Sequence, residues 1–165
     1  MASISEAALS VALRTKATPD TATGITGDQH GDAEQTDRYT QGTGSGQIDR
    51  CYKRVRTIGI GATDSYNLLA AGSLEDIIGQ AIDADELKGF VLRCTSGEIE
   101  LVASAGTPIG LFLAAGDGVP LTAGQWVAWG LGAAGLNVAT NSLFEITETS
   151  GAAAAAYELG LVVAQ

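Results

Sequence analysis

The side chains best suited to chemistry gather in one polar stretch of the N-terminal third. Acidic residues and the only histidine recur there at near-alternate positions: Asp28, His30, Asp32, Glu34 and Asp37. This alternation is typical of the oxygen ligands in a calcium-binding loop. Ala33, however, stands where such a loop needs a glycine for its sharp turn, and Tyr39 stands where it needs a bidentate glutamate. We therefore interpret the stretch as a solvated acidic loop and predict no metal site.

The remaining candidate groups do not combine into a catalytic site. With His30 as its only histidine, the chain is poorly suited to a Ser–His–Asp arrangement. Glu98 and Glu100 share one face of a predicted strand, and we interpret them as surface neighbours rather than a glycosidase pair. The glycine-rich residues 42–46 lack the lysine of a phosphate loop and are interpreted as a hinge. The sequence thus predicts that the protein is not an enzyme and has no catalytic or cofactor-binding residues.

Charge is distributed unevenly and points to a basic docking segment. Residues 58–165 hold two basic and twelve acidic side chains, so they carry the whole net charge of −10. Four of the nine bases fall within seven positions: Arg50, Lys53, Arg54 and Arg56. On a strand, Arg50, Tyr52, Arg54 and Arg56 share a face. This basic segment either docks on an acidic partner or protects an edge strand from aggregation. The overall acidity disfavours direct binding to nucleic acid.

Two tryptophans offer a further contact. Trp126 and Trp129 are three residues apart in a predicted strand, so they point to opposite faces. One belongs to the core, and the other is free for a subunit contact or, as the less favoured alternative, for stacking on a sugar. We assign the partner-binding role to Trp129.

The pattern of apolar runs predicts an all-β fold. Short apolar runs separated by turn-forming residues are expected to be strands at 51–60, 64–70, 87–95, 98–103, 109–114, 125–131, 142–149 and 155–163. About eight strands at this spacing favour a jelly-roll-like antiparallel β-sandwich. One short helix is expected at 73–79, capped by Ser73. The last two strands are expected to pair as a closing hairpin.

The chain divides near residue 50. Residues 51–165 form the predicted sandwich, and residues 1–50 form an extended N-terminal arm with a possible first strand around 10–16. Residues 19–47 are nearly free of apolar side chains, so they cannot offset the cost of ordering without a partner.

Features of targeting or oxidation are missing from the sequence. The N-terminus has no continuous apolar core of a secretory signal, and no window approaches the roughly 18 apolar residues of a membrane span. Cys51 and Cys94 are too few for a disulfide framework and lack zinc-ligand spacing. We expect reduced thiols, folding in the cytoplasm and no membrane partner.

Several turn-and-strand motifs resemble those of a known group of proteins. They are residues 42–52 (GTGSGQIDRCY), 56–58 (RTI), 74–82 (LEDIIGQAI), 87–92 (LKGFVL), 143–147 (LFEIT) and 157–159 (YEL). Together they are similar to motifs in small virion structural proteins of tailed bacteriophages, over about residues 40–165. The resemblance implies a β-sandwich made in the host cytoplasm and carried on the particle. Its favoured role is capsid cement or decoration.

That resemblance also implies the partners. A cement protein binds the major capsid protein across capsomers, stabilises the head and is often a homotrimer. A tail or baseplate component that binds a host surface glycan is the alternative, because it uses the same fold.

Overall fold

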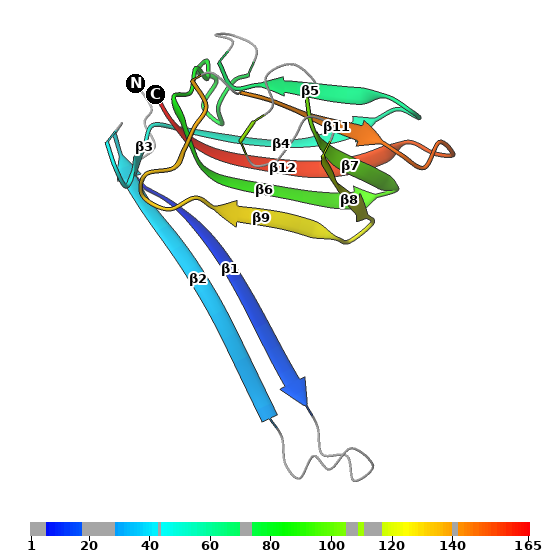
Figure 1. Ribbon diagram of the computed structural model, residues 1–165, viewed down its shortest axis with the longest axis horizontal. Helices are drawn as coiled ribbons and strands as arrows, with labels where there is room; N and C mark the ends of the chain where they lie inside the picture. The colour runs from blue at the N-terminus through cyan, green and yellow to red at the C-terminus, as the bar shows by residue number, and fades with distance from the viewer. Residues whose placement is uncertain are drawn as a thin grey trace.

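The structure is a computed structural model, and it describes residues 6–17, 29–42, 44–69, 74–104, 109–110, 117–139 and 142–165. These residues form an all-β protein with no helix in any of these ranges. Two sheets face each other in a sandwich-like body, and a long hairpin projects from one end of it (Figure 1). The predicted all-β class is confirmed.

One sheet has five strands. Its strands follow one another in the order β10 (Leu136–Asn137), β6 (Glu86–Ser96), β12 (Ala155–Ala164) and β4 (Arg50–Ile58), each hydrogen-bonded to the next. The fifth strand, β9 (Trp126–Gly130), also pairs with β6. All of these pairings are antiparallel. Strand β4 is therefore an edge of this sheet.

The facing sheet has four strands, also antiparallel. Their order is β5 (Thr63–Asn67), β11 (Leu143–Glu148), β7 (Glu98–Ala103) and β8 (Gly118–Thr122). The two sheets share one apolar core. Along β12, alternate residues are buried, namely Ala155, Tyr157, Leu159, Leu161 and Val163, and they meet Phe144, Ile146, Ile99 and Leu101 from the four-stranded sheet. This two-residue period is the one expected of strands with one face on a core.

The projecting hairpin is formed by β1 (Glu6–Ala17) and β2 (Gln29–Gln41), which pair antiparallel along their whole length. The short β3 (Gln47–Ile48) then runs parallel to the end of β2. Residues 29–37 thus lie in a strand, and the predicted acidic loop is wrong for these positions; Asp28 lies outside the described residues. The strand expected around 10–16 is confirmed within β1.

The root of the hairpin is built into the body of the protein. Tyr39 and Ile48 are 2% and 0% exposed. The Tyr39 hydroxyl donates to the Lys88 carbonyl at 3.0 Å, and the Gly46 amide donates to the Ala133 carbonyl at 2.9 Å. The end of the predicted arm is therefore fixed to the sandwich.

The predicted helix at 73–79 is not present in the described residues 74–79. Glu75 forms an isolated bridge with Ala81, and the Asp76 carboxylate accepts hydrogen bonds from the amides of Ile78 and Gln80 at 2.9 and 2.8 Å. An aspartate that satisfies the amides following it favours a turn over a helix. Ser73 lies outside the described residues.

The predicted closing hairpin is wrong. Strand β11 pairs with β5 and β7, whereas β12 pairs with β4 and β6, so the chain crosses between sheets after β11. The buried Glu148 shapes this crossing, because its carboxylate accepts hydrogen bonds from the amides of Gly61, Ser150 and Gly151. Of the strand predicted at 109–114, only residues 109 and 110 are described, and neither is in a strand.

Candidate functional site

The basic segment lies on β4, and the pairing of this strand decides which way its side chains face. Tyr52, Arg54 and Arg56 stand opposite Leu161, Leu159 and Tyr157 of β12, all of which are buried. The predicted shared face is thus the inner face of an edge strand. Its arginines leave the sandwich at the open edge, and inward-pointing charges of this kind protect edge strands from pairing with other chains.

Two of the arginines are already engaged within the chain. Arg50 lies 3.5 Å from Asp49 and 3.8 Å from the buried carboxylate of Asp76. Arg56 lies 3.4 Å from Asp64 of β5 and donates a hydrogen bond to it. These three ion pairs lie at the margin of the sandwich, where they connect β4 to neighbouring segments.

The other two cations pair with no acidic side chain among the described residues. The Arg54 guanidinium lies 5.4 Å from the centroid of the Tyr52 ring and donates to the Lys53 carbonyl at 3.2 Å. Lys53 is exposed on the opposite, outer face of β4. The basic segment is therefore divided between two faces, and docking by all four residues together stays a prediction.

A tyrosine cluster closes the sandwich beside Arg56. The hydroxyls of Tyr66 and Tyr157 lie 2.6 Å apart, and the Tyr157 hydroxyl donates to Asp64. Burial raises the pKa of Tyr66 and of Tyr157 above the usual range, so both phenols stay neutral. A neutral phenol network that joins β5 to β12 fastens the two sheets and supplies no nucleophile.

The two tryptophans divide between the faces of β9 as predicted. The Trp129 ring packs on Phe90 at 5.3 Å between centroids and is partly buried against the core. Trp126 is 52% exposed. The indole that projects outward is thus Trp126, and partner binding by Trp129 stays a prediction.

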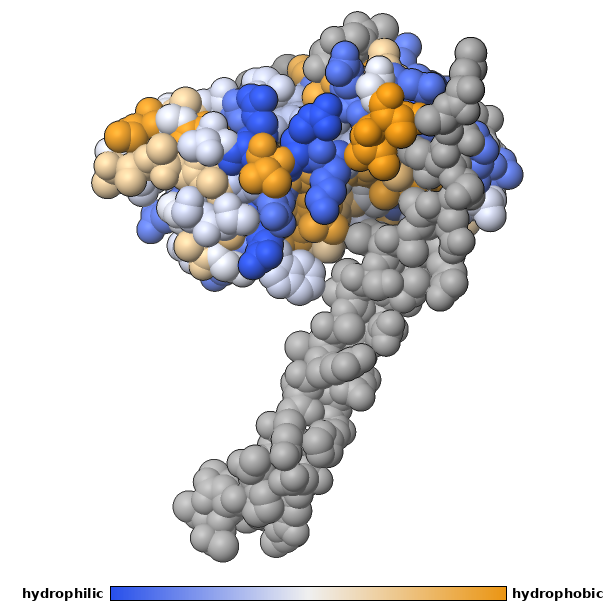
Figure 2. Space-filling view, turned by 180° about the vertical axis from the view of Figure 1, so that it is seen from behind, coloured by the Kyte–Doolittle hydropathy of each residue, from blue (hydrophilic) through white to orange (hydrophobic). Residues whose placement is uncertain are grey.

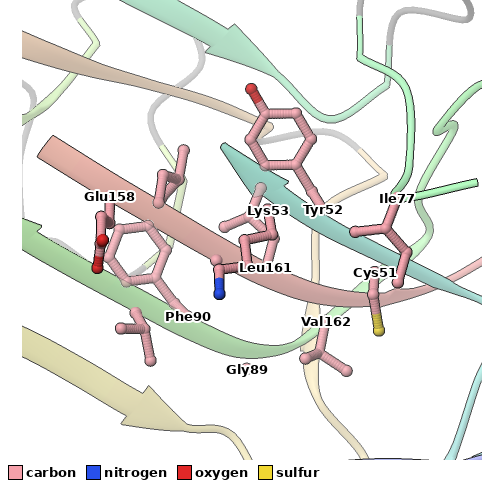
Figure 3. A pocket seen from close by; sticks show the side chains of 12 residues that line it. Cys51, Tyr52, Lys53, Ile77, Gly89, Phe90, Glu158, Leu161 and Val162 are labelled. Carbon is pink, nitrogen blue, oxygen red and sulfur yellow. The ribbon is translucent and has the colours of Figure 1, made fainter. Parts of the chain in front are cut away.

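An apolar groove crosses the outer face of the five-stranded sheet. It has a volume of about 450 Å³, and the residues whose side chains or glycine positions lie on this face are Cys51, Lys53, Ile77, Gly89, Val91, Glu158, Gly160 and Val162. In Figure 3, Cys51 and Val162 lie on one side of the sheet and Tyr52 lies on the other. Glycines in two neighbouring strands leave the floor of this outer groove low.

The thiol of Cys51 in the outer groove is a poor nucleophile. Burial, with a smaller contribution from the Asp76 carboxylate, raises the pKa of Cys51 to about 11. The reactive form of a cysteine is the thiolate, so Cys51 is inert near neutral pH. The groove is therefore suited to apolar contact.

The outer face of the four-stranded sheet has the opposite character. It carries Glu98, Glu100 and Glu145, and the register places Ser65, Val102 and Thr147 beside them. Glu98 and Glu100 share this face as predicted. No group of three or more metal-ligating side chains occurs in the part of the chain that the structure describes. Within the same residues there is also no helix with the length and hydropathy of a membrane span.

No family model matches the chain, and a search of curated proteins returned no match. The function is therefore argued from the geometry above.

Proposed function

We propose that this chain is a non-enzymatic virion structural protein, a capsid cement or decoration protein that binds across neighbouring subunits and stabilises the head. The observation that carries the proposal is the hairpin of β1 and β2, which leaves a fixed root and extends away from the sandwich (Figure 1). Twelve paired residues at about 3.3 Å each span roughly 40 Å. An element of this reach serves to bridge subunits.

The proposal includes the jelly-roll-like connectivity predicted from the sequence. In its support, the chain passes repeatedly between the sheets: β4 to β5, β5 to β6, β6 to β7, β8 to β9, β10 to β11 and β11 to β12 all cross. Frequent crossings of this kind are a feature of double-sheet jelly rolls, which recur in capsid proteins.

The surface chemistry supports an assembly role. The outer face of the four-stranded sheet is acidic, which suits contact with solvent, whereas the outer groove on the other sheet is apolar. The chain is expected to be a homo-oligomer, with a trimer predicted, and to bind the major capsid protein. Lys53 and Arg54 are the members of the basic segment best placed for an acidic partner surface.

The copy number on purified particles tests the role. Quantitative gel densitometry of virions that carry this chain should give hundreds of copies for a capsid-wide cement protein. A count of only a few copies would contradict the capsid assignment and favour a tail position.

A charge-matched pair of variants tests the docking surface. Lys53→Ala with Arg54→Ala removes two positive charges, and Ser65→Glu with Thr122→Glu adds two negative charges on the four-stranded sheet. We expect the first pair to weaken attachment to capsids that lack the chain, because electrostatic complementarity is lost at the contact. The second pair should attach normally. Equal attachment by both pairs would refute docking through Lys53 and Arg54.

The alternative role, glycan binding at a tail or baseplate, is favoured by one feature. The exposed Trp126 borders a shallow depression lined by Pro120, Leu121, Gly124 and Gln125. An exposed indole is a platform for a sugar ring. Trp126→Ala would abolish adsorption to host cells in this case and leave it unchanged if the chain is capsid cement.

A further inference from the structure

The outer groove has no cover among the described residues. Ile77, which lines it, is 55% exposed, and Val55, which the register places on the same face opposite Glu158, is 65% exposed. Figure 2 shows hydrophobic patches set among hydrophilic side chains on the side of the protein opposite that viewed in Figure 1. Exposed apolar side chains beside an apolar groove favour an interaction site.

The charge of this surface distinguishes it from the rest of an acidic protein. The register places Lys53, Arg93, Glu158 and Glu86 on this face. Arg93 lies 4.0 Å from Glu158, and Glu86 is paired with the ammonium of Lys88, so Lys53 is the charge on this face that has no acidic partner among the described residues. Residues 58–165 contain only two bases, and Lys88, the other one, is fully buried. The occupant of the groove should therefore be apolar, with an acidic group at its margin.

One face of the hairpin has these properties. The register places Leu9, Val11 and Leu13 of β1 on the same face, with Asp37 directly opposite Leu9 on β2. Among the paired residues 6–17 and 29–40, Asp37 is the only charged one on that face, whereas the other face carries six, namely Glu6, Arg14, Lys16, Asp32, Glu34 and Arg38. An isolated two-stranded hairpin is only marginally stable in water and needs packing against an apolar surface.

The hairpin is directed away from the groove of its own chain. Its root is held by the buried Tyr39 and Ile48 and by the hydrogen bonds to Lys88 and Ala133. From this root it extends outward, and its far end lies clear of the sandwich (Figure 1). A hairpin that extends outward in this way (Figure 1) can reach the groove of a second molecule.

We propose that the apolar face of the hairpin, carrying Leu9, Val11 and Leu13, docks in the outer groove of a second copy of this chain. The contact is heterologous, because it joins two different surfaces. Repeated around an axis it closes a ring, and the predicted trimer is one such ring. The inference rests on the bridging role proposed for the hairpin and names the surface that it bridges to.

One variant disrupts the hairpin side of the contact, and a second disrupts the groove side. Val11→Arg places a charge on the apolar face, and its matched control Ala12→Arg places the same charge on the opposite face of β1. Gly160→Trp fills the outer groove. A Cβ atom at Gly160 would meet only atoms at 4.0 Å, so the backbone at this position has room for a side chain that points into the groove. Thr147→Trp on the four-stranded sheet is its control.

Sedimentation velocity of the full-length chains, without capsids, measures the outcome. The wild type and both controls should form oligomers at tens of micromolar, whereas Val11→Arg and Gly160→Trp should each sediment as monomers. An equimolar mixture of these two variants should form heterodimers, because an intact hairpin from one can enter the intact groove of the other.

Three results would overturn the inference: a monomeric wild type, either variant associating like the wild type, or a mixture that stays monomeric. Capsid attachment is measured separately. If the chains do not self-associate as expected but attach normally to capsids, the self-contact is refuted and the proposed function stands. If they self-associate as expected but do not attach to capsids, the self-contact stands and the capsid role is refuted.

Discussion

Lys88 offers the sharpest test of how the hairpin root is held. The side chain is fully buried, and its ammonium donates to the carbonyls of Ala133 and Ala134 at 2.8 and 3.0 Å and to the carboxylate of Glu86. The Ala133 carbonyl also accepts the hydrogen bond from Gly46. One buried cation thus fixes the turn to which the hairpin root is attached.

Replacing this lysine by methionine keeps the apolar stem and removes the charge. Two carbonyls lose hydrogen bonds to a charged donor, each typically about 1.5–3 kcal/mol. Glu86 is 35% exposed, so water solvates its carboxylate and the cost stays below the upper range for a broken buried pair. We expect Lys88→Met to lower the free energy of unfolding by about 3 kcal/mol. For a chain of this size the midpoint temperature should fall by roughly 6–12 °C.

Thermal and urea unfolding followed by circular dichroism measure the effect. The control is Lys53→Met, which makes the same substitution at an exposed position of the same sheet and should change stability by no more than about 0.5 kcal/mol. If both variants unfold together with the wild type, the ammonium does not hold the turn and the reasoning fails.

Three further predictions concern single groups. Gly135 has a φ of +71°, and a Cβ atom there would lie 2.7 Å from Lys88 Cδ, so Gly135→Ala should lower the free energy of unfolding by about 1–3 kcal/mol or more. Gly132 has a similar φ of +67° but no atom within 4 Å of the added Cβ, so Gly132→Ala should show the backbone strain without the clash and lower the free energy of unfolding less in the same assay. Hydrogen bonds from Ser150 and the Gly61 amide lower the pKa of Glu148, so its contribution is present above about pH 4.5 and lost as pH falls through the folded pKa; Glu148→Gln should flatten this acid-side decline in urea titrations. The raised pKa of Cys51, about 11 against 9.0, stabilises the protein below pH 9 and this contribution is lost between pH 9 and 11; at pH 8 its alkylation by iodoacetamide should be slow in the native chain and fast in urea, and equal rates would contradict the burial.

The strands that the sequence predicted best are those whose alternation is clear. The strand predicted at 98–103 has the bounds of β7, and those predicted at 87–95 and 155–163 fall within one residue of β6 and β12 at each end. Strand β8 was missed because Gly118 and Pro120 lie within it. Its position at the edge of the sheet explains how it tolerates a proline, which cannot donate to a sheet ladder.

Which strands pair with each other was harder to predict from the sequence than where the strands lie. Residues 144, 146, 157, 159 and 161 are buried in alternation whether β11 and β12 pair side by side or face each other across the core. The same period therefore fits a hairpin and a crossing between sheets. Strand β2 was missed for a related reason: its residues are polar, and its order is tied to pairing with β1, which composition does not reveal.

The basic segment shows the same limit at the candidate site. A two-residue period placed Arg50, Tyr52, Arg54 and Arg56 on one face, and the register of β4 confirms this. The two-residue period does not show which of the two faces points inward. Because arginines rarely point toward a core, the inner face was not to be expected from the sequence. They do so here because β4 is an edge strand, where long side chains reach the solvent past the margin of the sheet.

The asymmetry between the two outer faces gives the sandwich a preferred orientation in an assembly. In the described strands, the face with Glu98, Glu100 and Glu145 has no basic residue beside them, so stacking copies through it would bring like charges together. The face with Lys53, Arg93 and Glu158 meets an acidic neighbour without this repulsion and buries apolar surface as it does so. The protein has a net charge of −10, so a surface with little negative charge is the one suited to contact between copies. This matters more for the choice of contact surface than the presence of the basic segment. The hairpin, with one acidic residue on its apolar face, is the part of the chain that fits this surface.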